Sequence, residues 1–276
     1  MLHTSTHQLH RHPSSPWAEL RVSAGSSNGY RMHTHAEYSV GIVDAGEAIF
    51  HHPSGPEKVC RGSVVLIEPG VIHACNPSQQ QVWSYRMLFL DAHWLHDQIK
   101  KWHSLSKPVT ALHFAARHIN DPATSALVDQ LCQPSANALD VRQQTQLLTP
   151  WLADLAQQGK PSDQPSYSVA LEPALRHVYS GANHGMTVRE LAQQCAMSPS
   201  QFIRRFKGVM GLPPGQYLQN LRINGARSLI ASGVSLADTA YAMGFADQAH
   251  LQRAFKVRHA MTPGNYAPPR TATGRR

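Results

Sequence analysis

The sequence has little of what membrane insertion, export or disulfide bonding requires. No apolar run approaches the ~20 residues that span a bilayer, and the first 16 residues are polar and rich in histidine, with no apolar core of a signal peptide. The four cysteines show no CxxC spacing, which favours reduced thiols over disulfides or a zinc knot. We therefore expect a cytoplasmic protein that makes no contact with a membrane.

Sequence signatures of common enzyme classes are also missing. The chain has no Gly-rich phosphate loop, no nucleophile elbow and no arrangement of paired carboxylates. We therefore expect that the protein is not an enzyme.

Acidic residues are scarce in the second half of the chain. From Ser166 to the end there are 13 Lys and Arg against 4 Asp and Glu, a net charge of +9, whereas the first 165 residues hold 12 against 13, a net charge of −1. A basic half favours binding to a polyanion such as DNA, although a solvated basic surface has the same composition.

Residues from about Trp17 to Leu90 are typical of an all-β domain. Short apolar runs alternate with glycine and proline turn signals, and many short strands with regular turns predict a β-barrel or sandwich. The runs are Tyr38–Val43, Ala48–Phe50, Val64–Ile67 and Val82–Leu90.

After Asp91 the pattern becomes helical, with a helix through Leu95 and others over Ala123–Cys132 and Leu139–Gln158. The last helix carries one apolar stripe, which could pack on its own domain or form a dimer seam. The stripe consists of Leu147, Leu148, Trp151, Leu152 and Leu155. A Pro- and Ser-rich segment follows, so we expect domains over 1–160 and 168–276, joined by a linker over 161–167.

The C-terminal part contains an internal repeat. Leu191–Tyr217 aligns with Thr239–Tyr266, at an offset of 48 before the turn and 49 after it. Each copy predicts an amphipathic helix, a tight turn and a second helix with an outward arginine, Arg204 or Arg253. In a helix-turn-helix the second helix enters the major groove, where arginine can bind guanine through two hydrogen bonds. A plain helical bundle would explain the apolar residues but not the paired arginines.

The motif A-x4-M-S-x-S-x-F-x-R-x-F-K-x3-G-x2-P-x2-Y, with its second copy, resembles the AraC/XylS family of bacterial regulators over about a hundred residues. The resemblance implies a double helix-turn-helix module, an effector domain, and DNA and RNA polymerase as partners. Base-facing positions carried onto this chain are Ser200, Ile203, Arg204, Gln248, Ala249, His250 and Arg253. Phosphate contacts are expected from Ser198, Lys207 and Lys256, and Gln201 and Asp247 at the helix starts complete the DNA interface. Ile203 is apolar where many relatives carry a polar residue, so the expectation there is either contact with a thymine methyl group alone or no base-specific contact.

The N-terminal strands resemble the cupin-like effector domain of the same family over about sixty residues. The matching pieces are His33-x-His35-x-x-Tyr38, Gly46, and Gly62 through Pro69-Gly70 to His73. The implied fold is α+β with two domains: a cupin-like β-barrel with a helical extension, and an all-α double helix-turn-helix. It implies a small-molecule effector pocket, while the stripe over Leu147–Leu155 predicts a homodimer through the N-terminal domain.

We predict that the effector pocket is lined by His33, His35, Glu37, Tyr38, His73 and Tyr85. Three histidines could also bind Zn²⁺ or another divalent ion, with Glu37 as a fourth ligand, but metal cupins place their glutamate further along the chain. A metal-dependent cupin enzyme or metal sensor fused to a DNA-binding module therefore stays the alternative to an effector-responsive regulator. A DNA-compacting protein would leave the barrel unused. The N-terminal histidines, His3, His7, His10 and His12, are expected to be disordered.

Overall fold

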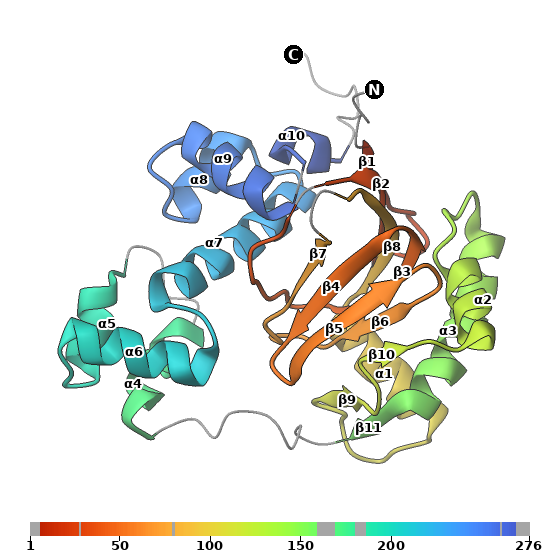
Figure 1. Ribbon diagram of the computed structural model, residues 1–276, viewed down its shortest axis with the longest axis horizontal. Coiled ribbons are helices and arrows are strands. Elements are labelled where there is room, and N and C mark those ends of the chain that lie inside the picture. Colours follow the sequence, from red (N-terminus) through yellow and green to blue (C-terminus); the bar gives the residue numbers. More distant parts are fainter. Residues whose placement is uncertain are drawn as a thin grey trace. The chain divides into compact units, whose positions relative to one another are not determined.

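The computed structural model describes residues 6–27, 29–78, 81–158, 169–179, 186–259 and 261–268. The chain divides into two compact units, Met1–Gln164 and Pro165–Arg276 (Figure 1). The linker predicted over 161–167 lies outside the described residues. Among the helices that the structure describes, none is long and apolar enough to cross a membrane.

The N-terminal unit is built on antiparallel sheets. Six strands are ordered β1 (Thr6–His10), β2 (Ala18–Ser26), β8 (Trp83–Leu90), β3 (Tyr38–Ala45), β6 (Val64–Ile67) and β10 (His118–Ile119). A second sheet is ordered β5 (Gly55–Cys60), β4 (Glu47–His52) and β7 (Ala74–Pro77), and β9 (Leu112–Phe114) pairs with β11 (Ala156–Gln158). The described strands thus form separate sheets rather than one closed barrel, which selects the sandwich alternative.

Strands predicted from the apolar runs are confirmed, with β6 matching its run at both ends. The expectation of a disordered N-terminal histidine tail is wrong for the described part. His7 and His10 lie in β1, which pairs with β2 along its whole length. His3 lies outside the described residues.

Three helices cover one face of the six-stranded sheet: α1 (Ala92–Trp102), α2 (Pro122–Leu131) and α3 (Ala138–Leu155) (Figure 1). Alternate residues of β3, including Tyr38, Val40 and Ile42, point to this side and are buried there. The hydrophobic core of the unit therefore lies between the sheet and the helices. The opposite face of the same strands turns toward the β5-β4-β7 sheet, since Tyr30 hydrogen-bonds to both Asn76 of β7 and Tyr85 of β8.

The apolar stripe of α3 belongs to this core. Leu148 and Leu152 are fully buried, and Leu147, Trp151 and Leu155 pack against the same cluster. The structure therefore favours packing within the domain, and the stripe gives no support to a dimer seam.

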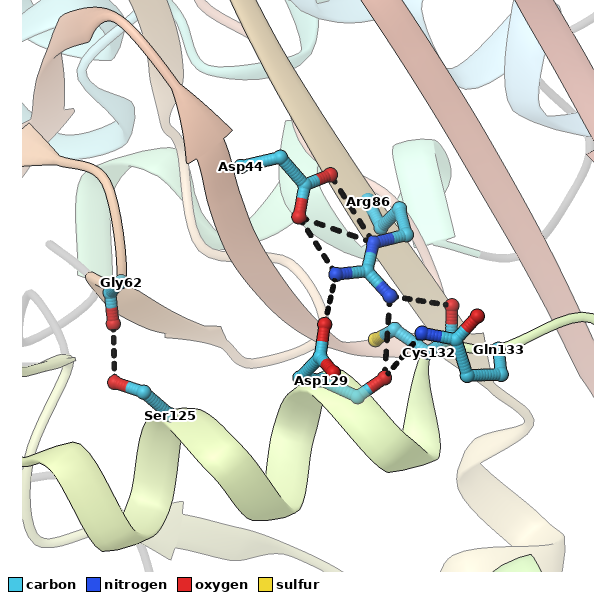
Figure 2. Close-up of polar contacts among 7 residues, drawn as sticks. All are labelled: Asp44, Gly62, Arg86, Ser125, Asp129, Cys132 and Gln133. Atoms are coloured by element: carbon cyan, nitrogen blue, oxygen red, sulfur yellow. Dashed lines mark hydrogen bonds and ion pairs between the residues drawn. The ribbon is translucent and has the colours of Figure 1, made fainter.

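Helix α2 is fastened to the sheets by hydrogen bonds at both of its ends (Figure 2). Near its start, the Ser125 hydroxyl donates to the carbonyl oxygen of Gly62. At its end, Arg86 of β8 donates to the backbone carbonyls of Asp129 and Cys132, at 3.1 and 3.2 Å. These carbonyls lie at the helix C-terminus, where the last turn has no partners of its own and attracts positive charge.

Arg86 also binds two carboxylates. Its Nε donates to both Asp44 oxygens, at 3.1 and 3.0 Å, and its Nη2 donates to Asp44 and Asp129 (Figure 2). Together with the two carbonyl bonds, these contacts engage every nitrogen of the guanidinium. Arg86 therefore joins β8, the end of β3 and α2 through one side chain.

The C-terminal unit is helical. After the turn η1 (Val169–Leu171) come α4 (Glu172–Tyr179), α5 (Val188–Gln194), α6 (Pro199–Met210), α7 (Pro214–Ala231), α8 (Leu236–Ala242), α9 (Gln248–His259) and α10 (Pro263–Tyr266). The bounds reproduce the repeat, because α5 and α8 begin and end 48 residues apart and α6 and α9 begin and end 49 residues apart. The α+β fold class with two domains is confirmed.

Candidate DNA interface and effector site

Both helix-turn-helix units turn through the same backbone geometry. Ala196 has a φ of 51° and Gly244 a φ of 69°, and both fall at the residue that follows the C-cap of the first helix. In the first copy the amide of Met197 donates to Ala192 O, and in the second the amide of Phe245 donates to Ala240 O. These bonds close a Schellman turn that satisfies the last helix carbonyls.

Each second helix is started by a side-chain cap. The Ser198 hydroxyl accepts from the amide of Gln201, whose side chain returns a bond to the Ser198 amide, as the capping-box pattern predicts. Asp247 accepts from the amide of His250 at 2.6 Å. These three predicted DNA contacts, Ser198, Gln201 and Asp247, thus have local partners, so their role in the free protein is to fix where α6 and α9 begin.

Helix α6 has a buried side and an exposed side. Phe202, Phe206 and Met210 are buried, whereas Ser200 and Arg204 are exposed. Ile203 is 41% exposed, which is unusual for its size, and Lys207 is exposed near the end of the helix. The predicted contacts of the first copy therefore share the solvent side of one helix.

Helix α9 repeats this arrangement. Leu251 and Phe255 are buried, and the exposed positions include the predicted contacts Gln248, Ala249, Arg253 and Lys256. His250 differs from the others, since its ring packs edge-on against Phe245 at 5.3 Å and is only partly exposed. Arg205 and Gln252 are also exposed, next to Arg204 and Arg253. The sequence analysis did not predict them as DNA contacts, although their positions beside the two arginines were a signal for that role.

Both recognition helices rest on the same aromatic contact. Phe206 meets Tyr217 of α7 with ring centroids 5.6 Å apart, and Phe255 meets Tyr266 of α10 at 5.4 Å. Arg227 of α7 donates to the Tyr266 hydroxyl at 2.8 Å. The repeated tyrosine thus anchors each recognition helix within the unit.

In the N-terminal unit the three predicted histidines come together. His33 and His73 form a β-bridge with mutual backbone hydrogen bonds of 2.9 Å, and their ring centroids lie 4.4 Å apart. The ring of His35 lies 4.8 Å from that of His73 and 6.3 Å from that of His33. His35 and His73 are buried, at 5% and 4% exposure.

Each of these rings donates its Nδ1 proton to a backbone carbonyl two residues away, at Arg31, Glu37 or Val71, over 2.8–2.9 Å. A carbonyl oxygen can only accept, so each neutral imidazole carries its lone pair on Nε2. Glu37 contributes to this cluster through its backbone carbonyl, which accepts the bond from His35. Within the described ranges, however, no group of three His, Cys, Asp or Glu side chains is arranged so that it could hold a metal ion.

The structure corrects the assignment of Tyr38 to the effector pocket. Its side chain points to the helical side of the sheet, where the hydroxyl contacts His96 Nε2 at 3.0 Å and accepts from the amide of Leu112 at 3.0 Å. The physical reason is the strand period, because Tyr38 shares its face of β3 with Val40 and Ile42, which lie in the core on the helical side.

Tyr85 does lie on the sandwich interior, on the same side as the histidines. Its hydroxyl is 2.7 Å from that of Tyr30, and its ring stacks on Trp83 with centroids 4.3 Å apart. Burial raises the pKa of Tyr30 and Tyr85, so both hydroxyls stay protonated near neutral pH.

Sequence reasoning missed Tyr30 and Arg21. Arg21 is 6% exposed on β2, and its guanidinium lies over the ring of Phe89 at 5.1 Å, while Phe89 meets His35 at 5.4 Å. The alternation Glu19-x-Arg21-x-Ser23 resembles a solvent-facing strand edge, which is why it gave no signal. All three residues are in fact buried.

The fold and the two sites define a DNA-binding regulator with a separate ligand-binding domain. A family model described as an AraC-like ligand binding domain matches residues 5–153, and a helix-turn-helix domain model matches residues 191–268. The first match alone spans more than half of the 276 residues. The chain belongs to the AraC family of transcriptional regulators.

Individual relatives agree with this assignment. The HTH-type transcriptional regulator YbfI of Bacillus subtilis is 23% identical over 232 residues, which is 82% of this chain and 83% of that protein. An AraC-like transcription regulator of Streptomyces antibioticus is 34% identical over 117 residues, 42% of this chain and 35% of that protein.

Solved structures show a similar fold across both domains. ToxT K231A of Vibrio cholerae, without ligand, has a TM-score of 0.55 at 13% identity, covering 91% of this chain and 96% of that chain. Wild-type ToxT bound to an unsaturated fatty acid has a TM-score of 0.56 at 12% identity, with coverages of 90% and 94%. At this identity the likeness shows the fold alone.

Proposed function

We propose that this regulator reads specific DNA with Arg204 and Arg253 and responds to a small molecule held between the sheets of its N-terminal domain. The observation that carries the DNA assignment is the repeated geometry. In both copies an exposed arginine follows the first buried apolar residue of the second helix by two positions. Such a side chain points outward from a helix that can enter the major groove.

A selection experiment followed by competition tests this assignment. The full chain is used to enrich binding sites from random duplex DNA, and affinity for the enriched site is then compared with that for unrelated DNA at fixed salt. A specific regulator should prefer its site by about 10³-fold or more. A preference near one would mean that the basic domain binds the DNA backbone only, since phosphate contacts carry no sequence information.

We further infer that the regulator acts in the cytoplasm as a homodimer, contacts RNA polymerase and catalyses no reaction. A dimer would match two-fold symmetric or repeated DNA sites. Because the α3 stripe is used inside the domain, the dimer surface must lie elsewhere. Sedimentation of the full chain at micromolar concentration tests the dimer, and a concentration-independent monomer would reject it.

The site between the sheets is the effector site that the geometry supports best. It gathers His33, His35, His73 and Tyr85 from separate segments onto one side of the sheet. A metal sensor or metal-dependent cupin stays the alternative, because three histidine rings come together there with centroids 4.4–6.3 Å apart.

A further inference from the structure

The two recognition helices carry different residues at one matched position. Helix α9 repeats α6 at an offset of 49 residues, so Arg253 is the counterpart of Arg204. By the same offset, Gln252 is the counterpart of Ile203. All four residues are exposed, and each pair directly follows the first buried residue of its helix. The fold therefore presents two neighbouring side chains to solvent at the same place in each copy.

The next position along the two helices does not share this exposure. Arg205 is exposed in α6, whereas its counterpart in α9, Ala254, is buried at 8% exposure. A position that faces the interior of the unit in one copy is not a contact position that the repeat shares. Of the residues beside the two arginines, Gln252 is therefore one whose place is exposed in both copies.

Gln252 also lies on the same side of α9 as the basic residues. Residues four apart lie on one side of a helix, so Gln248, Gln252 and Lys256 form one stripe, and all three are exposed. Arg253 borders this stripe, since it lies three residues before Lys256. Gln252 precedes Arg253 and is therefore nearer to the N-terminal end of α9, which is the end that faces base edges in a helix-turn-helix. A groove that admits Arg253 thus also receives the Gln252 side chain.

The amide of Gln252 is not used to build the fold. Gln201 of α6 offers the contrast, because its side chain bonds to the amide of Ser198 in the capping box. Among the residues that the structure describes, none is hydrogen-bonded to the side chain of Gln252. Its carbonyl oxygen and its NH₂ group, an acceptor beside a donor, therefore both remain available to a partner outside the protein.

We propose that Gln252 determines base specificity in α9 by binding an adenine beside the base that Arg253 contacts. A glutamine amide forms two hydrogen bonds with adenine, because it accepts from N6 and donates to N7. Among the four bases, adenine alone carries both a donor and an acceptor on its own major-groove edge. Ile203 has no hydrogen-bonding group in its side chain, so the two recognition helices differ in readout at this position. This assignment rests on the proposed reading of DNA by Arg204 and Arg253, to which it adds a further residue.

Modified bases in the selected DNA site test the proposal on the full chain. At each A·T pair in turn, adenine is replaced by 7-deazaadenine, which lacks the N7 acceptor and still pairs with thymine. At one pair this change should weaken binding of the wild-type chain by about 10-fold, as expected when one hydrogen bond to a base is lost. The Gln252→Ala variant should bind the unmodified site about 10-fold more weakly, and at that pair it should no longer distinguish 7-deazaadenine from adenine.

Two control variants separate base readout from other roles. Gln216→Ala removes an exposed glutamine of α7 and should change neither the affinity nor the response to 7-deazaadenine. Lys256→Ala should weaken binding to all sequences alike and reduce the salt dependence of binding, as loss of a phosphate contact does. Gln252→Ala should instead keep the salt dependence of the wild-type chain, because an uncharged amide releases no counterions from DNA.

The role of Gln252 and the proposed function fail in different ways. A Gln252→Ala variant that keeps wild-type affinity, weakens on all sequences alike or still responds to 7-deazaadenine at that pair would overturn the role of Gln252. In each of these cases the proposed function stands, provided that Arg253→Ala loses base preference. If selection enriches no site, or if Arg253→Ala also keeps its full base preference, reading of bases by α9 is itself rejected, and the role of Gln252 with it.

Discussion

Ala196 and Gly244 occupy the same position in the two helix-turn-helix units, 48 residues apart, and both have a positive φ. For glycine this conformation carries no penalty, whereas for alanine its Cβ meets the neighbouring carbonyl at a cost of about 1–2 kcal/mol. The first turn therefore stores strain that the second does not.

The first prediction is that Ala196→Gly stabilises the C-terminal domain by about 0.5–1 kcal/mol, because relief of strain exceeds the extra entropy of glycine in the unfolded chain. Gly244→Ala should destabilise it by about 1 kcal/mol or more. All five tryptophans, at positions 17, 83, 94, 102 and 151, precede residue 165. Tryptophan fluorescence therefore follows unfolding of the N-terminal domain only, whereas far-UV circular dichroism follows both domains. A transition seen by circular dichroism but not by fluorescence reports the C-terminal domain. If Ala196→Gly lowered the stability of the C-terminal domain, the claim that Ala196 is strained would be wrong.

The second prediction concerns DNA readout. Arg204→Ala or Arg253→Ala should each cost about 1–3 kcal/mol on the selected site and relax base preference in one part of it. Lys207→Ala should weaken binding to all sequences about equally and lower the salt dependence, as a phosphate contact does. Electrophoretic mobility titrations on a panel of single base-pair changes separate these effects. An Arg204→Ala variant with full affinity for the selected site would show that α6 does not read bases in the major groove.

Most of the helical unit could be predicted from the sequence because its signals are local. Capping boxes at Thr187 and Ser198, turn residues and the period of buried residues all concern neighbours within a few positions. The burial of Arg21 and Tyr30 is a different case. It depends on what packs against the face of β2 that carries Arg21, and nothing in the alternation of one strand tells whether its polar side is covered.

The assignment of Tyr38 failed for a related reason. Proximity along the chain placed it beside His35, but the period of two in a strand sends it to the helical core. His33, His35 and His73 were found together because their cupin-like spacing carries a tertiary signal. The role of Arg86 has no local sequence signal, since its partners Asp44 and Asp129 are distant in sequence.

The third prediction is that Arg86→Met destabilises the N-terminal domain by about 2–3 kcal/mol. The substitution removes the C-terminal cap of α2 and leaves Asp44 without its cation, which is costly for partly buried groups. Arg176→Met is the matched control, because its pair with Glu172 is exposed on both sides and should change stability by less than about 0.5 kcal/mol. The free energy of unfolding in urea is measured by tryptophan fluorescence for Arg86→Met and by circular dichroism for Arg176→Met. Equal small effects would show that the Arg86 contacts contribute no more than a surface pair.

The fourth prediction is a loss of N-terminal stability in mild acid. Burial lowers the pKa of His96 and, with the charge of Arg21 as a smaller cause, that of His7, from an ordinary value of 6.5. A lowered folded pKa means that the unfolded chain binds more protons, so stability is full above pH 6.5 and falls as the pH drops through the folded values. His96→Gln should make the fluorescence-detected midpoint in urea less dependent on pH. An unchanged pH profile in this variant would reject the contribution of His96.

The last prediction distinguishes two hypotheses for the histidines: that they bind an organic effector, or that they bind a metal ion. His33 and His73 share a β-bridge, and the Nδ1 atom of each donates to a backbone carbonyl. If the site holds an organic effector, the double variant His33→Ala and His73→Ala should lose ligand binding while the purified wild-type chain contains no stoichiometric metal. Operator affinity without ligand should be unchanged, because the histidines and the recognition helices belong to separate compact units. Elemental analysis of the wild-type chain, with and without added Zn²⁺, decides the alternative. One equivalent of zinc that disappears in the double variant would establish the metal site, and unchanged ligand affinity in the folded double variant would remove the histidines from the pocket.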